Sequence, residues 1–177
     1  MEGHNFYFIH IPKTGGTSIY NALEPFMDEP IHEHKPRFKV DTDKFTFAIV
    51  RNPYNWLGSY FEYVQSINHH DSHIKDFNEY VKVFCERVKN ENFDSGQMHY
   101  YTQTTCAKGC DFIGKFEKID KAWWTILERI GLDYFPLPHI NKSKGLKDYS
   151  YLYDIESIEL VNETFKEDFI NYGYERR

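Results

Sequence analysis

The chain has 177 residues and a formal net charge of −6 at pH 7, from 21 Lys and Arg against 27 Asp and Glu. This length predicts one domain, 1–177, with its own hydrophobic core, and the acidic balance argues against nucleic acid or an anionic membrane as main partner. Aromatic residues make up 18%, too many for a disordered chain, and no apolar run is long enough to span a membrane. Three cysteines, an odd number, and no visible secretory signal predict reduced thiols in a cytoplasmic protein.

Strands and helices are expected to alternate along the chain. Buried strands are predicted at 6–11, 45–50 and 112–116. Helical patterns follow, with the first at Ile19, Ala22, Leu23 and Phe26 and the later ones after Asn52, at about 74–90, at 119–130 and at 154–169. Asn52 and Pro53 suit a helix cap and a first helical position, and Gly131 suits a helix end. Strands separated by helices predict an α/β layer with a largely parallel sheet.

Residues 12–18, Pro-Lys-Thr-Gly-Gly-Thr-Ser, connect the first strand to its helix. Glycines allow a close backbone approach to a ligand, and the N–H groups at a helix start favour an anion. Lys13 adds a positive charge, but it precedes the glycines, whereas the lysine follows them in the nucleotide signature G-x-x-x-x-G-K-[ST]. This segment is interpreted as an anion site, with a simple turn that exposes a lysine as the alternative.

A second cluster follows the second strand. Arg51 ends that strand, and Ser59 lies about two turns into the next helix. The carboxyl ends of parallel strands share one edge, so Arg51 and Lys13 are expected to face the same crevice. An arginine there can bind a phosphate through two N–H groups, and pairing with a structural carboxylate is the alternative.

With both clusters in place, the chain resembles the sulfotransferases that use 3′-phosphoadenosine 5′-phosphosulfate (PAPS). It is most similar to the branch of heparan sulfate 2-O-sulfotransferase and many small bacterial and viral members. Segments 8–18 and 47–61 resemble the 5′-phosphosulfate loop and the 3′-phosphate motif, and 112–117, 137–143 and 153–174 match later blocks in order. The resemblance implies an α/β three-layer sandwich with a central, mostly parallel sheet and a P-loop-NTPase-like fold.

The resemblance also implies the reaction, in-line transfer of a sulfuryl group from PAPS to an acceptor hydroxyl or amine, with PAP as product and no metal. Lys13 would stabilise the leaving phosphate, and Arg51 and Ser59 would hold the 3′-phosphate. The cradle of the 5′-phosphate would be Thr14, Gly15, Gly16, Thr17 and Ser18. A loop that closes over the nucleotide would contain Asn141, Lys142 and Ser143.

The acceptor must lose a proton, so a base is needed. Residues 32–34, His-Glu-His, are similar to a His-x-His segment of the 2-O-sulfotransferase branch, which makes His34 the first candidate and His32 the second. A solvated loop is the other interpretation of both. Glu62 is a weaker candidate, and His10 is expected to have a core or supporting role.

The acceptor is not readable from the sequence. A saccharide hydroxyl is the first expectation, and a lipid, a small metabolite or a protein tyrosine stays open. A non-catalytic nucleotide-binding module is the main alternative, while a kinase is disfavoured because G-x-x-x-x-G-K-[ST] is missing. The missing transmembrane stem of Golgi relatives favours a bacterial or viral origin.

Residues 68–73, Asn-His-His-Asp-Ser-His, are interpreted as an exposed turn, so no metal site is predicted.

Overall fold

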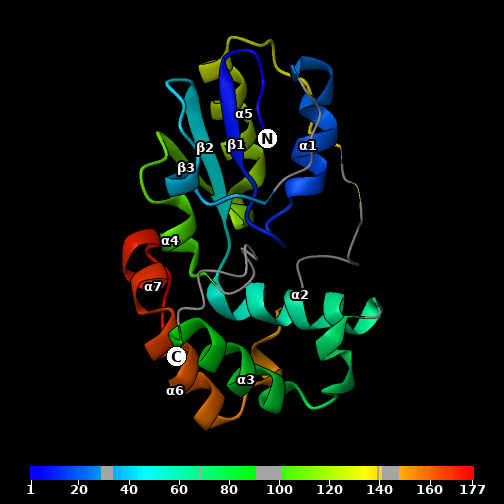
Figure 1. Cartoon of the computed structure of the whole chain (residues 1–177), viewed down its shortest axis with the longest axis vertical. Coiled ribbons are helices and arrows are strands. Elements are labelled where there is room, and N and C mark those ends of the chain that lie inside the picture. Colours follow the sequence, from blue (N-terminus) through cyan, green and yellow to red (C-terminus); the bar gives the residue numbers. More distant parts are fainter. Residues whose placement is uncertain (29–33, 68, 91–100, 139, 141–147) are drawn as a thin grey trace. The chain divides into compact units, whose positions relative to one another are not determined.

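The computed structural model describes the chain except for residues 29–33, 68, 91–100, 139 and 141–147. Its contacts form two compact units (Figure 1). The sheet unit comprises Met1–Arg51 and Thr105–Gly145, and the helical unit comprises Asn52–Thr104 and Leu146–Arg177. No helix in the described ranges is long and apolar enough to cross a membrane. None of the three cysteines is paired in a disulfide.

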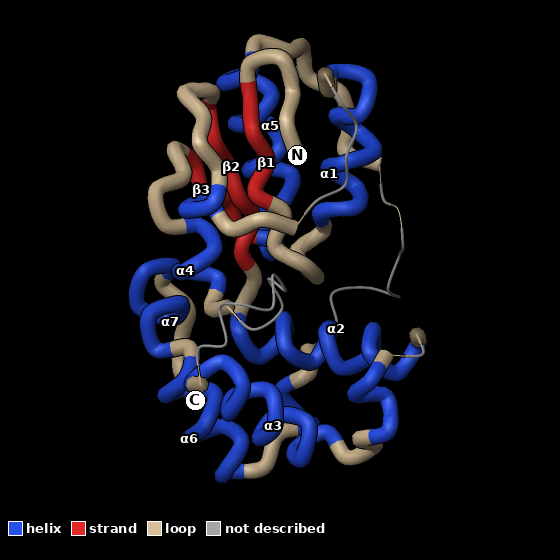
Figure 2. The backbone as a smooth tube through the Cα atoms, viewed as in Figure 1, coloured by secondary structure: helices blue, strands red, loops and turns tan. Residues whose placement is uncertain are grey.

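The sheet unit contains three parallel strands, β1 (Phe6–Ile9), β2 (Phe45–Val50) and β3 (Phe112–Lys115), in the order β1-β2-β3. Figure 2 shows them side by side. The pairing of β1 with β2 ends at Ile9 and Ala48, so β1 is two residues shorter than predicted. The prediction of an α/β chain with a parallel sheet is confirmed.

Helices α1 (Gly16–Leu23) and α5 (Ile119–Ile130) pack on the same face of this sheet. Their apolar residues share one buried cluster with alternate strand residues, namely Phe6, Phe8, Phe47 and Ile49. Gly131 ends α5, as predicted. The prediction that Phe26 lies on the buried face of the first helix is wrong, because α1 ends at Leu23 and Phe26 is 40% exposed. Pro25 has no N–H to continue the α-helical bonding, and a 3-10 turn, Glu24–Phe26, follows instead.

The helical unit is built from α2 (Pro53–Ser66), α3 (Phe77–Lys89), α6 (Ile155–Thr164) and α7 (Lys166–Tyr172). The Asn52 side chain accepts hydrogen bonds from two backbone amides at the start of α2, which confirms the predicted cap. The single helix predicted over 154–169 is divided at Phe165, whose fully buried ring packs 5.7 Å from Trp56. A short helix not predicted from the sequence, α4 (Gln103–Ala107), spans the sequence boundary between the two units.

Candidate active site

The three strands end at one edge of the sheet, and the segment after each strand contributes to one cluster. Arg51, which follows β2, donates a hydrogen bond from Nη1 to the Lys13 carbonyl, at 3.3 Å, in the loop after β1. The guanidinium carbon of Arg51 lies 4.5 Å from the centre of the Phe116 ring, which follows β3. The structure therefore brings the Arg51 guanidinium to the backbone of Lys13 at the carboxyl edge.

The loop between β1 and α1 has an unusual backbone. Lys13 has φ +64° and Gly15 has φ +85°, both in the left-handed region. For a residue with a Cβ atom this conformation costs roughly 1–2 kcal/mol. The buried Thr14 hydroxyl donates to the Ile11 carbonyl at 2.7 Å, and together with the bond from Arg51 to Lys13 it holds the loop in place. Strained residues that the surrounding structure holds in this way are typical of ligand-binding loops.

The two glycines allow this loop to pack closely on its neighbours. A Cβ atom on Gly16 would lie 1.9 Å from the His10 ring, and one on Gly15 would lie 2.9 Å from Ile119. Gly15 is the N-cap of α1, and within the described part of the chain no side chain caps this end and no acidic residue occupies its first turn. The partial positive charge of the helix start is therefore available to an anion.

His34 is joined to the same loop through His10. The two rings lie 4.3 Å apart between centroids, and His34 Nδ1 is 3.1 Å from the His10 carbonyl oxygen. A carbonyl only accepts hydrogen bonds, so Nδ1 carries the hydrogen and Nε2 has the lone pair of the neutral ring. His10 is buried between Phe8, on which it stacks, and Gly16.

A comparison with profiles of known protein families identifies the family of the chain. The profile described as "Sulfotransferase family" matches residues 1–175. The chain belongs to the sulfotransferase family. It is accordingly an enzyme of sulfate transfer, and the match extends over both units. No curated protein and no solved structure matches the chain significantly.

Other site residues expected for a sulfotransferase are placed as follows. Ser18 is 8% exposed, and its hydroxyl accepts a hydrogen bond from the Ile140 amide at 3.2 Å. Ser59 is half-buried on α2 in the helical unit. Glu62, on the same helix, accepts a 2.6 Å hydrogen bond from the Tyr149 hydroxyl. Four residues expected in the site lie outside the described residues: His32, Asn141, Lys142 and Ser143.

Phe116 is a site residue that sequence reasoning missed. Its ring lies under the Arg51 guanidinium and 3.1 Å from where a Cβ atom on Gly15 would be, so it adjoins both Arg51 and the loop before α1 in the candidate site. A cation over an aromatic face is stabilised by about 0.5–2 kcal/mol, depending on exposure. The available signal was its position at the carboxyl end of the third predicted strand, at the edge where Lys13 and Arg51 were expected.

Proposed function

We propose that this enzyme transfers the sulfuryl group of PAPS to an acceptor hydroxyl, with a saccharide as the first candidate acceptor. The observation that carries the proposal is the left-handed Lys13, held by Arg51 directly before the uncapped start of α1. Two cations and a helix N-terminus at one sheet edge suit a ligand with more than one anionic group. The three-layer, P-loop-NTPase-like form of the family fold is part of the same proposal.

The residues of the loop fit a 5′-phosphate. The backbone amides of Gly15, Gly16 and Thr17 and the Lys13 ammonium are the proposed donors, and bound PAPS would supply the sulfuryl group beside them. The Ser18 amide donates to the Gly15 carbonyl at 3.1 Å, so it is proposed only as a donor shared with the phosphate. The Thr14 hydroxyl donates to Ile11, so Thr14 is proposed to contact the phosphate through its backbone amide alone. Lys13 would stabilise the negative charge that develops on the leaving phosphate.

The 3′-phosphate is assigned to Arg51 and Ser59. A guanidinium is a planar fork of five N–H donors that matches a phosphate, and Phe116 fixes its plane from below. Recognition of this second phosphate would separate PAPS from nucleotides of the ATP type. Asn141, Lys142 and Ser143 keep their proposed role in covering the nucleotide.

His34 is the proposed general base, with His32 as the second candidate. Because His34 Nδ1 donates to the His10 carbonyl, Nε2 is the atom that would take the proton of the acceptor hydroxyl. A neutral imidazole accepts protons near pH 7, and general base catalysis is typically worth about 100–10,000-fold in rate.

Titrations with PAP and AMP test the nucleotide assignment without knowledge of the acceptor. A charge-assisted hydrogen bond contributes roughly 1.5–3 kcal/mol, so the wild type should bind PAP at least about tenfold more tightly than AMP. Arg51→Ala should remove most of this preference. Because Arg51 also bonds to the Lys13 carbonyl, the variant can lose AMP affinity too, so the ratio of the two affinities is the quantity to compare.

Arg129→Ala is the matched control, since Arg129 is exposed in the last turn of α5. Equal wild-type affinities for PAP and AMP would contradict the assignment of Arg51 to a phosphate. A screen of saccharides, lipids, small metabolites and tyrosine peptides with labelled PAPS would then identify the acceptor. Tight PAP binding without transfer to any hydroxyl compound would favour the non-catalytic module instead.

A further inference from the structure

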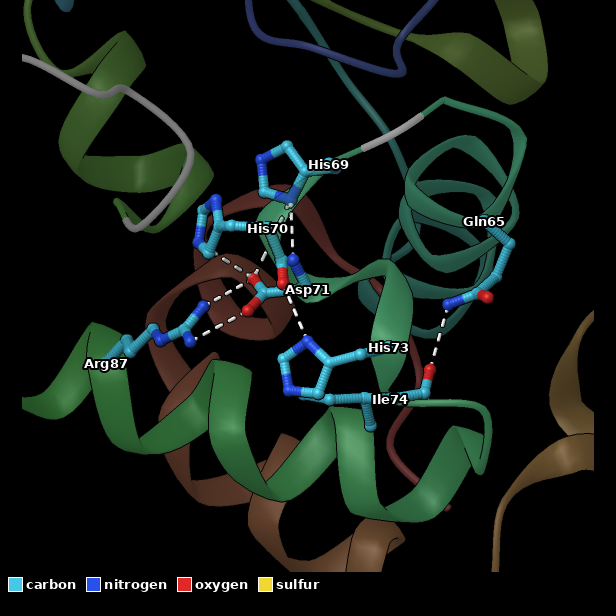
Figure 3. Close-up of polar contacts among 7 residues, drawn as sticks. All are labelled: Gln65, His69, His70, Asp71, His73, Ile74 and Arg87. Atoms are coloured by element: carbon cyan, nitrogen blue, oxygen red, sulfur yellow. Dashed lines mark hydrogen bonds and ion pairs between the residues drawn. The ribbon is translucent and has the colours of Figure 1, made fainter.

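The turn after α2 gathers three potential metal ligands outside the proposed active site. The ligand atoms of His69, His70 and Asp71 all lie within 4.8 Å of one another. His70 Nε2 is 3.2 Å and His69 Nδ1 is 3.9 Å from Asp71 Oδ2. Figure 3 shows both histidines next to this carboxylate. From the sequence, residues 68–73 are interpreted as an exposed turn, because spacing alone does not show whether neighbouring side chains converge.

Asp71 is held in position from the neighbouring helix. Its side chain is only 2% exposed, and both of its oxygens accept hydrogen bonds from Arg87 on α3, the one to Nη2 at 2.8 Å (Figure 3). Burial acts to raise the pKa of Asp71, but the Arg87 guanidinium outweighs it and holds this pKa below its ordinary value. The carboxylate is therefore charged at neutral pH. A fixed, anionic carboxylate with an outer partner is the usual arrangement around a protein metal ligand.

The hydrogen bonds define the protonation of the two rings. The Asp71 amide donates to His69 Nδ1 at 3.3 Å, so this nitrogen has a lone pair. Burial, and then the neighbouring His70, lower the pKa of His69, which keeps its ring neutral at neutral pH. His70 Nε2 must carry a hydrogen to bond to the Asp71 carboxylate.

We propose that His69, His70 and Asp71 form a binding site for a divalent transition-metal ion of the zinc type. Two nitrogens and one carboxylate oxygen are ligands that Zn²⁺ accepts, and at bond lengths of about 2.0–2.1 Å tetrahedral ligand atoms lie roughly 3.3 Å apart. The 3.2 Å pair already has this separation. The 3.9 Å pair needs a small rotation of the His69 ring, which also breaks the hydrogen bond from the Asp71 amide so that the Nδ1 lone pair can bind the ion.

The ion takes the place of the hydrogen between His70 Nε2 and Asp71 Oδ2. As a metal ligand the His70 ring is neutral with its single hydrogen on Nδ1, so Nε2 has the lone pair that binds the ion. A carboxylate has about four lone-pair positions, so Arg87 keeps one bond to each oxygen while the ion takes the position on Oδ2 that the His70 hydrogen held. The positive charge of Arg87 repels the ion, and the negative charge of Asp71 offsets this repulsion. Because protons compete with a metal ion for imidazole nitrogens, affinity should fall as the pH is lowered.

Calorimetric titration of the untagged, metal-free full chain with Zn²⁺ tests the proposal. One equivalent should bind at pH 7.5, and His69→Ala and His70→Ala should each weaken binding at least about tenfold. His4→Ala is the control for the loss of any histidine, because the His4 side chain is 94% exposed in the sheet unit and lies outside the cluster. Asp71→Asn is a poor first test, since losing the buried ion pair with Arg87 can unfold the chain.

A second measurement keeps the test independent of enzyme activity. Ligand at a hundredfold excess over its Kd should raise the Tm by roughly 5–11 °C for a chain of this size, and the two histidine variants should lose this shift at the same Zn²⁺ concentration. Equal Zn²⁺ affinity in the wild type and in both variants would place the bound ion elsewhere and overturn the proposal. The absence of any binding at about 100 µM Zn²⁺ would do the same.

Discussion

Two replacements of Lys13 distinguish the effect of its ammonium charge from the effect of its left-handed backbone. Lys13→Ala and Lys13→Gly both remove the ammonium group that is proposed to stabilise the leaving phosphate. Loss of one such donor typically lowers turnover by about 100–1,000-fold, so both variants should lose sulfuryl transfer to that extent. Both should also bind PAP at least about tenfold more weakly, since a charged hydrogen bond is lost.

The two variants should differ in stability because Lys13 has φ +64°. Alanine keeps the left-handed penalty of roughly 1–2 kcal/mol, whereas glycine adopts this conformation freely. Glycine also lowers the free energy of unfolding by about 0.5–1 kcal/mol, because the unfolded chain has more conformational freedom at a glycine. The balance favours Lys13→Gly by about 1 kcal/mol, which corresponds to a Tm higher by ~2–4 °C than that of Lys13→Ala.

Thermal unfolding of the two variants, followed by circular dichroism or calorimetry, measures this difference. The matched control is Lys121, exposed in the first turns of α5, where glycine should instead be less stable than alanine by about 1 kcal/mol. A Lys13→Gly protein that unfolds below Lys13→Ala would refute the left-handed conformation. Folded Lys13 variants with full sulfuryl transfer would refute the role of the ammonium.

Three further predictions follow from other contacts. His34→Gln should lower sulfuryl transfer by about 100-fold or more while PAP affinity stays within about twofold, and an unchanged rate would move the base to another residue. Gly16→Ala should lower stability by about 1–3 kcal/mol, measured by denaturant unfolding, because its Cβ atom would meet the His10 ring at 1.9 Å; an unchanged midpoint would contradict this packing. Asp71, whose pKa Arg87 holds below the ordinary value against the effect of burial, stabilises the fold above pH of about 4, and this contribution is lost as the pH falls through the folded pKa. Asp71→Asn should therefore have a lower Tm than wild type at pH 7, with a difference that shrinks as the pH falls below about 4, whereas a constant difference would exclude this linkage.

Local patterns in the sequence were enough for most of the helices and strands. Strand β2 and the cap at Asn52 depend on neighbouring residues, because the periodicity of burial and helix capping act over a few positions. The order of strand, glycine turn and helix around Lys13 also predicted an anion site at the carboxyl edge. The break at Phe165 was not readable in this way, because the ring is drawn into a core that includes Trp56, about a hundred residues away in the chain.

Contacts between distant residues decided the rest. Arg51 meets the Lys13 carbonyl across 38 positions, and His34 meets His10 across 24. The contact between His34 and His10 determines which nitrogen of His34 would act as the base, and the spacing of residues in the sequence does not predict this. The left-handed backbone of Lys13 likewise depends on what holds the loop, since a lysine by itself disfavours that conformation. Periodicity records which face of an element is buried, whereas strain, tautomers and converging ligands arise only when folded segments meet.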